Sequence, residues 1–536
     1  MKNYFLITFL ILGTVSNAFS KNECAIEQRI DTIKDFREFK VLDSKYINND
    51  ALWAPFNKDL KDFSEATYLV LKPLILDQNI PTLQKNIAEG KLTYEKLVLF
   101  YLYRIRKFDR ENMLSLNAVI ALNPNVVAEA RQKDKEPKPL LGLSVFGMPI
   151  LLKDNINVAG MPTTAGAAAL QQNMAEDAFI VKQLKNNGAL ILGKANLSEW
   201  AYFFCGDCPS GYSAVGGQTL NPYGRRIFDT GGSSSGSGVA VAANFCVAAV
   251  GSETSGSILS PSSQNSVVGL KPTIGLLSRT GIIPISSTLD TPGPITKNVI
   301  DNAIMLEAMT GFDKDDSASV ASGQESFSNL NNILKGRRFG AFKGLMEDSL
   351  YVEALSKLKN EGAEIIEIEQ PQINLPGFIR LLNLDMKKDL PVYFQKNANA
   401  AIALKSVEDV MEFNRKDSLR RAPYGQALFK GIVADKGSSE DLERIKDTLS
   451  TNGKLFFEGP MKMHNLDGIL SINNFYAGYA AVAKYPALTI PMGYQKDGKP
   501  RGLTFIAKPF QEEFLLQWAY EYEKASKKRI APKNYN

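Results

Sequence analysis

The sequence predicts an α/β fold in which helices cover a central β-sheet on both faces. Two observations predict this class. Between residues 140 and 251, short apolar segments typical of buried strands alternate with segments of helical spacing. The 536-residue chain has 44% hydrophobic and 22% charged residues, which is the composition of a globular protein with a large buried core.

The first part of the chain is predicted to be mostly helical. Residues 21–90 are expected to form helices and irregular segments, with Trp53 and Phe56 as packing anchors. The run TYEKLVLFYLYRIRKF, which begins at Thr93, has apolar residues at helical spacing behind a threonine that can cap a helix. This run is therefore predicted to be a buried helix with a basic outer face.

The strand and helix alternation follows a polar linker. LLGLSVFGMPILLKDN is strand-like and ends in a charged pair, and helical FIVKQLKNNG, stopped by Gly188, precedes strand-like ALILGK. GSGVAVAAN has the small residues of a tightly packed helix, and CVAAVG is apolar on both faces, as in a fully buried strand. These segments form the predicted core of the sheet.

The composition of the sequence changes between about 313 and 460. Charged residues are more frequent there, and segments such as SVEDVMEFNRKDSLRR have apolar residues at helical spacing. Apolar strands return in YPALTIPMGY and GLTFIA, and a helix EEFLLQWAYEYEKA follows. We therefore expect a single domain over 21–536, with a variable, cap-like elaboration at about 313–460.

The first twenty residues are expected to be an export signal. Lys2 precedes the apolar run FLITFLILGTV, and Ala18 and Ser20 supply small residues at the two positions that a signal peptidase reads. The run is shorter than the roughly 20 residues of a membrane span, and no later stretch reaches that length. Cys24 lacks the preceding residues of a lipid-attachment site. These features predict a soluble exported protein, periplasmic or secreted, without stable membrane insertion.

Charge and cysteines exclude several functions. The net charge of +5 is spread along the chain without a basic block, so no nucleic-acid partner is expected. Cys24, Cys205, Cys208 and Cys246 could pair in three ways in an oxidising compartment. Cys205 and Cys208 have CxxC spacing, but no second CxxC occurs, which favours a local disulfide over a metal or redox site. No metal and no cofactor are expected.

His464 is the only histidine of the chain. Serine hydrolases commonly use histidine as the base, yet MKMHNLDGI has the features of an ordinary surface or hydrogen-bonded site. Zinc hydrolases with several histidine ligands are excluded, and no HExxH occurs. A hydrolase with this sequence therefore needs a base other than histidine.

Two glycine- and serine-rich loops carry the chemical signal. GGSSSGSG (231–238) and GSETSGSILSPSS (251–263) lie at opposite ends of one helix–strand unit, so both loops can meet beside the same sheet. A flexible linker does not explain the patterned residues between them, and the first loop lacks the lysine of a P-loop. Backbone N–H groups of such loops can still bind an oxyanion.

With GLKPTIGLLSRTGIIPISSTLDTPGPITKNV, these loops resemble the amidase signature family. The resemblance extends through LNAVIALNP, FGMPILLKDNINVAGMPTT, NNGALILGKANLSEWA, GGQTLNP and YPALTIPMGYQKDGKPRGLTFIA, in order, over roughly 70–312 and 465–528. It implies the fold of that family, a central twisted mixed β-sheet covered by helices on both faces.

The resemblance also implies a Ser–Ser–Lys triad. Ser257 in TSGSI matches the nucleophile, Ser233 in GGSSSG matches the bridging serine, which usually follows a cis peptide bond, and Lys153 in LLKDN matches the base. The backbone of Thr254, Ser255 and Gly256, together with Ser257, is expected to bind the oxyanion. A lysine can act as a base only when burial lowers its pKa from about 10.4, and Lys153 follows an apolar run that could bury it.

The substrate is expected to be an amide without a carboxylate. Family members that act on carboxylated substrates generally have arginine two residues after the nucleophile, where this chain has Leu259. NLSEWA, GGQTLNP, GSETSGSIL and GLLSRTGIIPIS are most similar to bacterial peptide amidases, which implies hydrolysis of C-terminal peptide amides or other small uncharged amides. Leu259 suits an apolar ligand, whereas Phe203 and Phe204 are expected to be core residues more than ligand contacts.

Three alternatives remain open at this point. One keeps the catalyst but changes the substrate to aryl, indole or fatty acyl amides or esters. The second is a non-catalytic binding protein on an amidase scaffold, against which the presence of all three triad residues argues. The third is an amidotransferase subunit, which the export signal and Leu259 oppose. The sequence does not indicate an oligomeric state.

Overall fold

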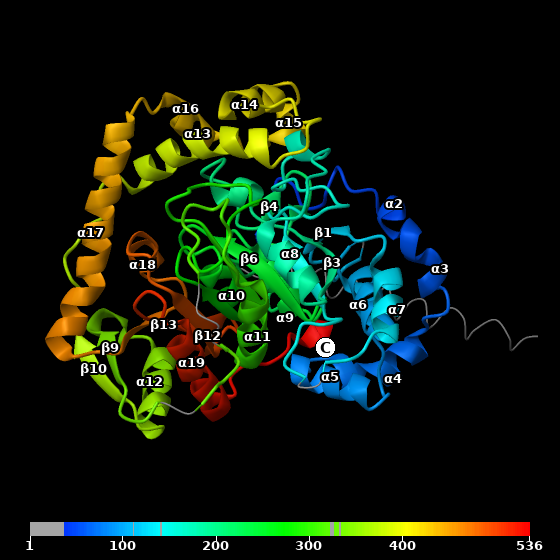
Figure 1. Cartoon of the computed structure of the whole chain (residues 1–536), viewed down its shortest axis with the longest axis horizontal. Coiled ribbons are helices and arrows are strands. Elements are labelled where there is room, and N and C mark those ends of the chain that lie inside the picture. Colours follow the sequence, from blue (N-terminus) through cyan, green and yellow to red (C-terminus); the bar gives the residue numbers. More distant parts are fainter. Residues whose placement is uncertain (1–36, 111, 140–141, 322–325, 332–333) are drawn as a thin grey trace, which may run out of the picture. The chain divides into compact units, whose positions relative to one another are not determined.

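The core of the fold is a mixed β-sheet of eleven strands, as predicted from the alternation of apolar and helical segments (Figure 1). The computed structural model describes residues 37–110, 112–139, 142–321, 326–331 and 334–536. In spatial order the strands are β1 (Val119–Leu122), β3 (Leu190–Ala195), β2 (Pro149–Lys153), β6 (Ala248–Glu253), β8 (Thr291–Thr296), β7 (Val268–Lys271), β12 (Ala487–Tyr494), β13 (Pro500–Ile506), β11 (Gly468–Ile472), β9 (Arg338–Phe342) and β10 (Glu364–Ile368).

Three neighbouring strands, β3, β2 and β6, run parallel to one another. Their side chains are buried on both faces, which explains their near-continuous apolar sequence. Because they are parallel, their carboxyl ends share one edge of the sheet, and ligand sites of α/β proteins lie at such edges. Lys153 and Glu253 are the last residues of β2 and β6 and therefore lie at this edge.

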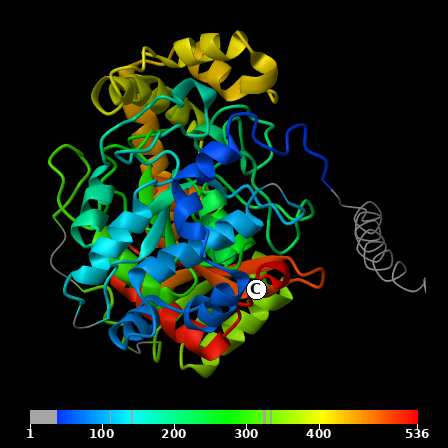
Figure 2. The same cartoon turned by 90° about the vertical axis from the view of Figure 1, so that its right-hand side faces the viewer.

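The first helices lie beside the end of the chain. They are α2 (Asn49–Trp53), α3 (Asn57–Leu60), α4 (Glu65–Ile75), α5 (Ile80–Ala88), α6 (Tyr94–Phe108) and α7 (Val126–Lys135). Thr93 caps α6 by accepting a hydrogen bond from the N–H of Lys96, as its sequence predicts. Arg104 of α6 donates to the carbonyl oxygen of Tyr535, so the C-terminal residues pack against this group of helices (Figures 1 and 2).

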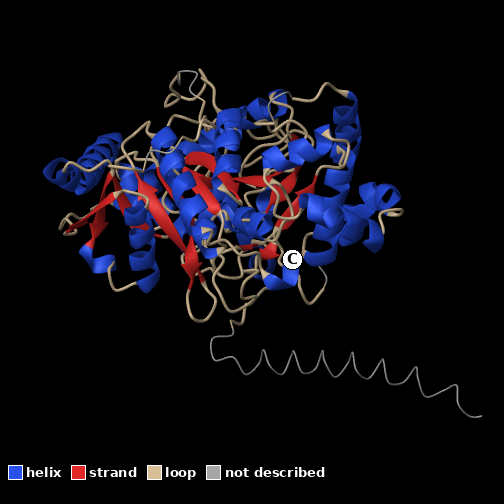
Figure 3. Ribbon diagram, turned by 90° about the horizontal axis from the view of Figure 1, so that it is seen from below, coloured by secondary structure: helices blue, strands red, loops and turns tan. Residues whose placement is uncertain are grey.

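Helices lie on both sides of the strands (Figure 3), in agreement with the predicted fold class. Among those that contact the sheet are α9 (Ser235–Ala242), α10 (Leu259–Gln264), α11 (Val299–Met309), α12 (Ser349–Asn360) and α19 (Glu512–Ser526), while α8 (Phe179–Asn186) packs on α11. The small residues of α9 allow very close packing. A Cβ atom on Gly236 would lie only 2.4 Å from the carbonyl oxygen of Asn196, so only glycine fits there.

The segment from 313 to 460 supplies both sheet and helices. Its strands β9 and β10 extend the sheet at the edge opposite β1. Its remaining helices are α13 (Phe378–Lys396), α14 (Val407–Arg415), α15 (Ser418–Arg421), α16 (Ala427–Ala434) and α17 (Ser439–His464), and α17 packs on α18 (Ala477–Val482). The predicted helical stretch SVEDVMEFNRKDSLRR is divided into α14 and α15. The predicted domain limits stay a prediction.

Several other expectations concern termini, cysteines and metals. The predicted export signal and Cys24 lie outside the described residues. Cys205 and Cys208 form a disulfide, and Cys246 is buried with a free thiol. In the part of the chain that the structure describes, no helix is long and apolar enough to cross a membrane. The same residues contain no cluster of histidine, cysteine and carboxylate side chains that could hold a metal ion.

Candidate active site

Lys153 lies at the end of β2 with its side chain fully buried. Its Nζ is 2.7 Å from Ser233 Oγ, and it is 2.9 Å from both the carbonyl oxygen and the Oγ of Ser252. A neutral amine has two N–H groups and one lone pair. An ammonium group can donate to all three oxygens, and a neutral amine can keep the same contacts when its lone pair accepts the hydroxyl proton of Ser233 and its two N–H groups point to Ser252.

The surroundings of Lys153 favour this neutral form. Burial lowers the pKa of its amine to about 7, and the charges of Asp290 and Glu253 oppose the shift only in part. None of the three groups that contact Nζ is a carboxylate. Lys153 is thus a lysine that can accept a proton near neutral pH.

Ser233 follows a cis peptide bond between Gly232 and Ser233 and is fully buried. Its carbonyl oxygen accepts a hydrogen bond from the N–H of Ser198, 3.0 Å away. The two following hydroxyls are used elsewhere: Ser234 Oγ donates to Ser252 and Ser235 Oγ donates to Gly231. Among these three successive serines, Ser233 is the one whose hydroxyl contacts Lys153.

The two glycine- and serine-rich loops meet, as the sequence predicts. Ser257 lies between β6 and α10, is 9% exposed, and accepts at its carbonyl oxygen a hydrogen bond of 3.2 Å from the N–H of Ser234. Ser234 also joins the loops through Ser252, because its Oγ accepts from the N–H and donates to the carbonyl oxygen of that residue. The structure therefore brings Lys153, Ser233 and Ser257 together at the carboxyl ends of the parallel strands.

Glu253 holds the backbone around Ser257, a role that the sequence analysis missed. Its carboxylate accepts from the N–H groups of Gly256 at 2.6 Å, Ile258 at 2.7 Å and Leu259 at 3.0 Å. A charged acceptor of three backbone N–H groups fixes this turn firmly. The signal that could have found it is an acidic residue at the end of an apolar strand, four positions before Ser257.

This contact changes the expected oxyanion donors. The N–H of Gly256 points to Glu253, so Gly256 contributes its left-handed backbone, with φ of +85°, rather than a donor. Thr254, Ser255 and Ser257 remain, because their N–H groups face no hydrogen-bond acceptor within the described residues. A Cβ atom at position 256 would lie 3.0 Å from Asn474 Nδ2, which is a second reason for glycine at this position.

Asp290 anchors the start of the same loop. Thr254 Oγ1 donates to its carboxylate at 2.5 Å, and the N–H groups of Ile285 and Ser286 donate to it at 2.8 and 2.9 Å. Burial raises the pKa of Asp290 to about 6, against the effect of these hydrogen bonds. Asp290 therefore carries a negative charge at neutral pH close to Thr254.

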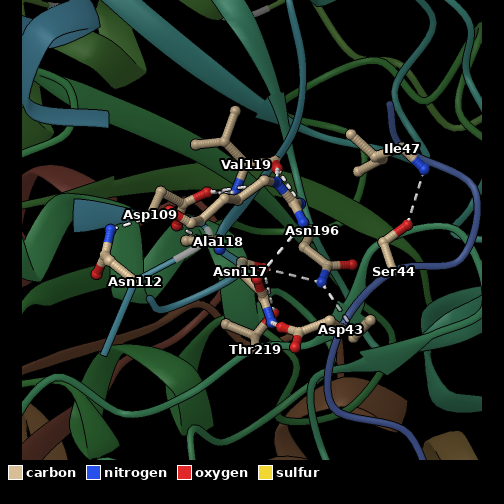
Figure 4. A network of polar contacts seen from close by, with 12 residues as sticks. Asp43, Ser44, Ile47, Asp109, Asn112, Asn117, Ala118, Val119, Asn196 and Thr219 are labelled. Carbon is tan, nitrogen blue, oxygen red and sulfur yellow. Dashed lines mark hydrogen bonds and ion pairs between the residues drawn. The ribbon is translucent and has the colours of Figure 1, made fainter. Parts of the chain in front are cut away.

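A polar network around Asn117 (Figure 4) joins segments that contact the loop and helix after Ser233. Asn196 Nδ2 and Thr219 Oγ1 both donate to the carbonyl oxygen of Asn117, each at 3.0 Å. The backbone N–H of Asn196 donates to Ala118, and its carbonyl oxygen accepts from Gly236 at 2.9 Å. Three sequence motifs that are far apart along the chain thus meet under the first turn of α9.

A cavity of about 450 Å³ lies next to these residues. Ser252, Asn155 and Thr254 belong to its wall, whereas Ser257 is not one of its lining residues. The predicted apolar contact of Leu259 with a ligand is wrong, because this side chain is 1% exposed and packs in the core. Phe203 and Phe204 are buried in an apolar cluster, in line with the core role that the sequence favoured.

Comparisons with known proteins agree on one family. The amidase family model matches residues 96–440. A protein of Arabidopsis thaliana named a probable amidase is 35% identical over 484 residues, which cover 86% of this chain and 92% of that protein. An amidase family protein from Bacillus anthracis is 36% identical with a TM-score of 0.86, covering 92% of this chain and 99% of that chain.

The native peptide amidase of Stenotrophomonas maltophilia is also similar, at 36% identity and a TM-score of 0.80, with 85% of this chain and 98% of that chain covered. Hydrolases of this kind use a serine, a serine after a cis peptide bond, and a lysine. The family match, the fold and the meeting of these residue types lead to one conclusion: the chain belongs to the amidase signature family and is an amidase.

Proposed function

We propose that this amidase hydrolyses carboxamide bonds through an acyl-enzyme, with Ser257 as nucleophile, Ser233 as proton relay and Lys153 as base. One observation carries the assignment: the buried Nζ of Lys153 lies 2.7 Å from Ser233 Oγ without a carboxylate in contact. A lysine in this state has the lone pair that a general base needs.

In the first half of the reaction, Lys153 takes the hydroxyl proton of Ser233, which takes the hydroxyl proton of Ser257. The oxygen of Ser257 then forms a bond with the amide carbonyl carbon. When the C–N bond breaks, the proton returns along the same path to the leaving nitrogen, which departs as ammonia or an amine. In the second half, water loses a proton to the same path and attacks the ester carbonyl. When the ester C–O bond breaks, the proton returns along the path to Ser257 Oγ and the carboxylic acid is released.

The oxyanion of the tetrahedral intermediate needs N–H donors that are free. We assign this role to the backbone N–H groups of Thr254, Ser255 and Ser257. Each such donor is commonly worth about 3 kcal/mol of transition-state stabilisation. Glu253 and Asp290 hold the two sides of this loop in place through Gly256 and Thr254, so the donors are oriented before the substrate arrives.

C-terminal peptide amides are the favoured substrate class, and other small amides without a carboxylate come next. The similarity to a structure named as a peptide amidase and the motifs shared with such enzymes support this choice. The alternative is an aryl, indole or fatty acyl amide or ester. A non-catalytic role is disfavoured, because a scaffold without turnover would not need a buried lysine against Ser233.

A substrate panel tests the proposal. Ammonia release is measured from peptide amides, aryl amides and aliphatic amides, and ester hydrolysis is measured beside it. We expect the highest kcat/KM with peptide amides and no turnover with the Ser257→Ala variant. The absence of ammonia from every peptide amide would overturn the substrate assignment, and labelling of Ser257→Ala by a fluorophosphonate would overturn the nucleophile.

We propose separately that the chain is exported, on the basis of the sequence of residues 1–20. A disulfide between Cys205 and Cys208 suits an oxidising compartment. Expression with its own N-terminus in a bacterial host, followed by N-terminal sequencing of the periplasmic protein, tests it. Cleavage after Ser20 is the expected result, and an uncleaved protein in the cytoplasm would contradict it.

A further inference from the structure

The cavity beside Ser252 has a wall that comes from several separate parts of the chain. Its lining includes residues 279–287, the start of β8, the loop at 315–317 and part of α13. Its volume of about 450 Å³ is within the range of pockets that hold small ligands. Because Ser252 contacts Lys153 and Thr254 begins the oxyanion loop, a substrate group in this cavity lies beside the reacting amide.

One face of α13 belongs to this wall. Asp389, Val392, Tyr393 and Lys396 line the cavity, and their spacing of three, four and seven residues places them on one side of a helix. Tyr393 is 3% exposed and fixes the helix by donating to Asn157 Oδ1 at 2.7 Å. The segment 313–460, through α13, therefore contributes side chains that a substrate would meet next to the site.

The charges of this wall are unequal. It contains the carboxylates of Asp290, Asp315, Asp316 and Asp389, but only the two cations Arg279 and Lys396. Arg279 donates a bidentate hydrogen bond to the carboxylate of Asp316, so the charges of these two residues neutralise each other. The balance of the remaining wall is negative.

Asp389 is the carboxylate best placed to receive a ligand. It accepts a hydrogen bond of 2.6 Å from the N–H of Ser287, and no cation contacts its carboxylate within the described residues, although its charge and that of Arg279 act on each other at longer range. Burial raises its pKa, and the nearby Asp385 adds to this effect while Lys388 opposes it. A partly buried carboxylate without a cation is stabilised when a cationic group binds beside it.

Unpartnered polar atoms supply a second, independent observation. Asn155 lines the cavity and is 2% exposed, yet its Oδ1 has no hydrogen-bond partner among the described residues, and the same is true of Thr280 Oγ1. Buried acceptors without partners are costly and are normally satisfied. A ligand that brings N–H groups into the cavity would meet acceptors here.

We propose that this cavity is a substrate subsite for a positively charged, hydrogen-bond-donating group, an ammonium or guanidinium, and that Asp389 selects it. The inference rests on the proposed function and narrows it to amides of basic amino acids or of peptides with such a group near the amide. Lys396, which is exposed on the same wall, weakens the preference because its charge has the same sign as the ligand.

The test uses three substrates of nearly equal size: N-acetyl-lysine amide, N-acetyl-norleucine amide and N-acetyl-glutamate amide, with ammonia release as the readout. We expect kcat/KM to fall in that order, with about a tenfold advantage of lysine over norleucine. Norleucine amide with a free α-amino group, measured beside its acetylated form, tells whether an α-ammonium takes the same place as the side-chain ammonium.

Two variants of opposite sign complete the test. Asp389→Asn keeps an acceptor for the N–H of Ser287 but loses the charge, and it should abolish the advantage of the cationic substrate, measured as the ratio of kcat/KM for the lysine amide to kcat/KM for the norleucine amide. Lys396→Gln, at an exposed position, should increase the advantage. Glu408→Gln, on the exposed side of α14, is the matched control and should change neither value.

Each outcome decides the question. A preference for the cation that disappears in Asp389→Asn and grows in Lys396→Gln supports the subsite. Equal kcat/KM for the lysine and norleucine amides, or a preference that survives Asp389→Asn, overturns it while the proposed function stands. No ammonia from any of these amides overturns both.

Discussion

Two fully buried lysines lie on neighbouring parallel strands, and their partners differ. Lys153 ends β2, and Lys194 lies on β3 beside Leu152 of the same ladder. Lys194 Nζ is 3.0 Å from Asp154 Oδ1 and also contacts Thr163. Lys153 has only hydroxyl and carbonyl oxygens in contact.

A buried lysine can act as a base when no carboxylate contacts its amine. Burial lowers the pKa of both amines, but at Lys194 the carboxylate of Asp154 opposes the shift through direct contact. At Lys153 the opposing carboxylates, Asp290 and Glu253, act only from a distance. We infer that Lys194 remains an ammonium ion that binds the loops together, whereas Lys153 can take up and release a proton.

The largest expected effect is on turnover. Lys153→Met should lower kcat/KM by about 10³-fold or more, because the relay through Ser233 loses its base. Methionine is close in size, so the fold should persist in circular dichroism. Lys194→Arg is the comparison variant, since it keeps the cation beside Asp154. Near-normal turnover of Lys153→Met would break the comparison.

The same variant should change the pH dependence of stability. The folded pKa of Lys153, about 7, lies below that of the unfolded chain, so between about pH 7 and 10 the unfolded state binds more protons. The contribution of Lys153 to the free energy of unfolding of the wild-type protein therefore rises with pH between about pH 7 and 10. Lys153→Met should be at least as stable as wild type at pH 7, with the gain shrinking by pH 10, as measured by urea unfolding.

Replacement of Lys194, in contrast to replacement of Lys153, should lower the stability of the protein. Lys194→Met leaves the carboxylate of Asp154 buried without its cation, which costs about 3–5 kcal/mol in the free energy of unfolding. The double variant Lys194→Met with Asp154→Asn removes that charge and should recover part of the loss. Urea unfolding at pH 7.5 measures both, and a cost below about 1 kcal/mol for the single variant would contradict the structural role.

Glu253→Gln tests whether the loop around Ser257 must be held by a carboxylate. One carboxylate oxygen of Glu253 accepts from Gly256, and the other accepts from Ile258. A glutamine has a single side-chain oxygen, so it can accept from only one of these two sides. We expect kcat to fall about a hundredfold through misplacement of Ser257. Glu408→Gln is the matched control, and an unchanged kcat in Glu253→Gln would show that the turn holds without the charge.

Removal of the charge of Asp290, which does not contact Lys153, should have a small effect on the pKa of that lysine. Asp290 raises the pKa of this lysine. Asp290→Asn should therefore move the midpoint of the pH profile of kcat/KM downward by less than about one pH unit. A midpoint that moves upward would mean that the charge of Asp290 does not act on Lys153.

Much of the site could be predicted from sequence because its chemistry lies in short segments. The two serine-rich loops and the end of β2 carry Lys153, Ser233 and Ser257 in local motifs. The direction of the Gly256 N–H could not be predicted, because it depends on how Glu253 turns at the end of β6. Short motifs do not encode such a choice.

Contacts between distant segments were also beyond the sequence pattern. The burial of Leu259 depends on how α10 packs on the sheet, and its position after the nucleophile gave no sign of it. The cavity wall joins α13 to residues 279–287 through contacts such as Ser287 N–H to Asp389, about a hundred positions apart. Apolar spacing predicted helices in that region but not which face meets the site.

The labelling rate of Ser257 by a fluorophosphonate tests most directly whether Lys153 is a base near neutral pH. This reaction needs the activated serine but no amide substrate and no product release. The rate constant should rise with pH to a plateau, with a midpoint near the lysine pKa of about 7. Lys153→Met should label far more slowly at every pH. A flat profile from pH 5.5 to 9, or fast labelling of the variant, would show that Lys153 is not the base that activates Ser257.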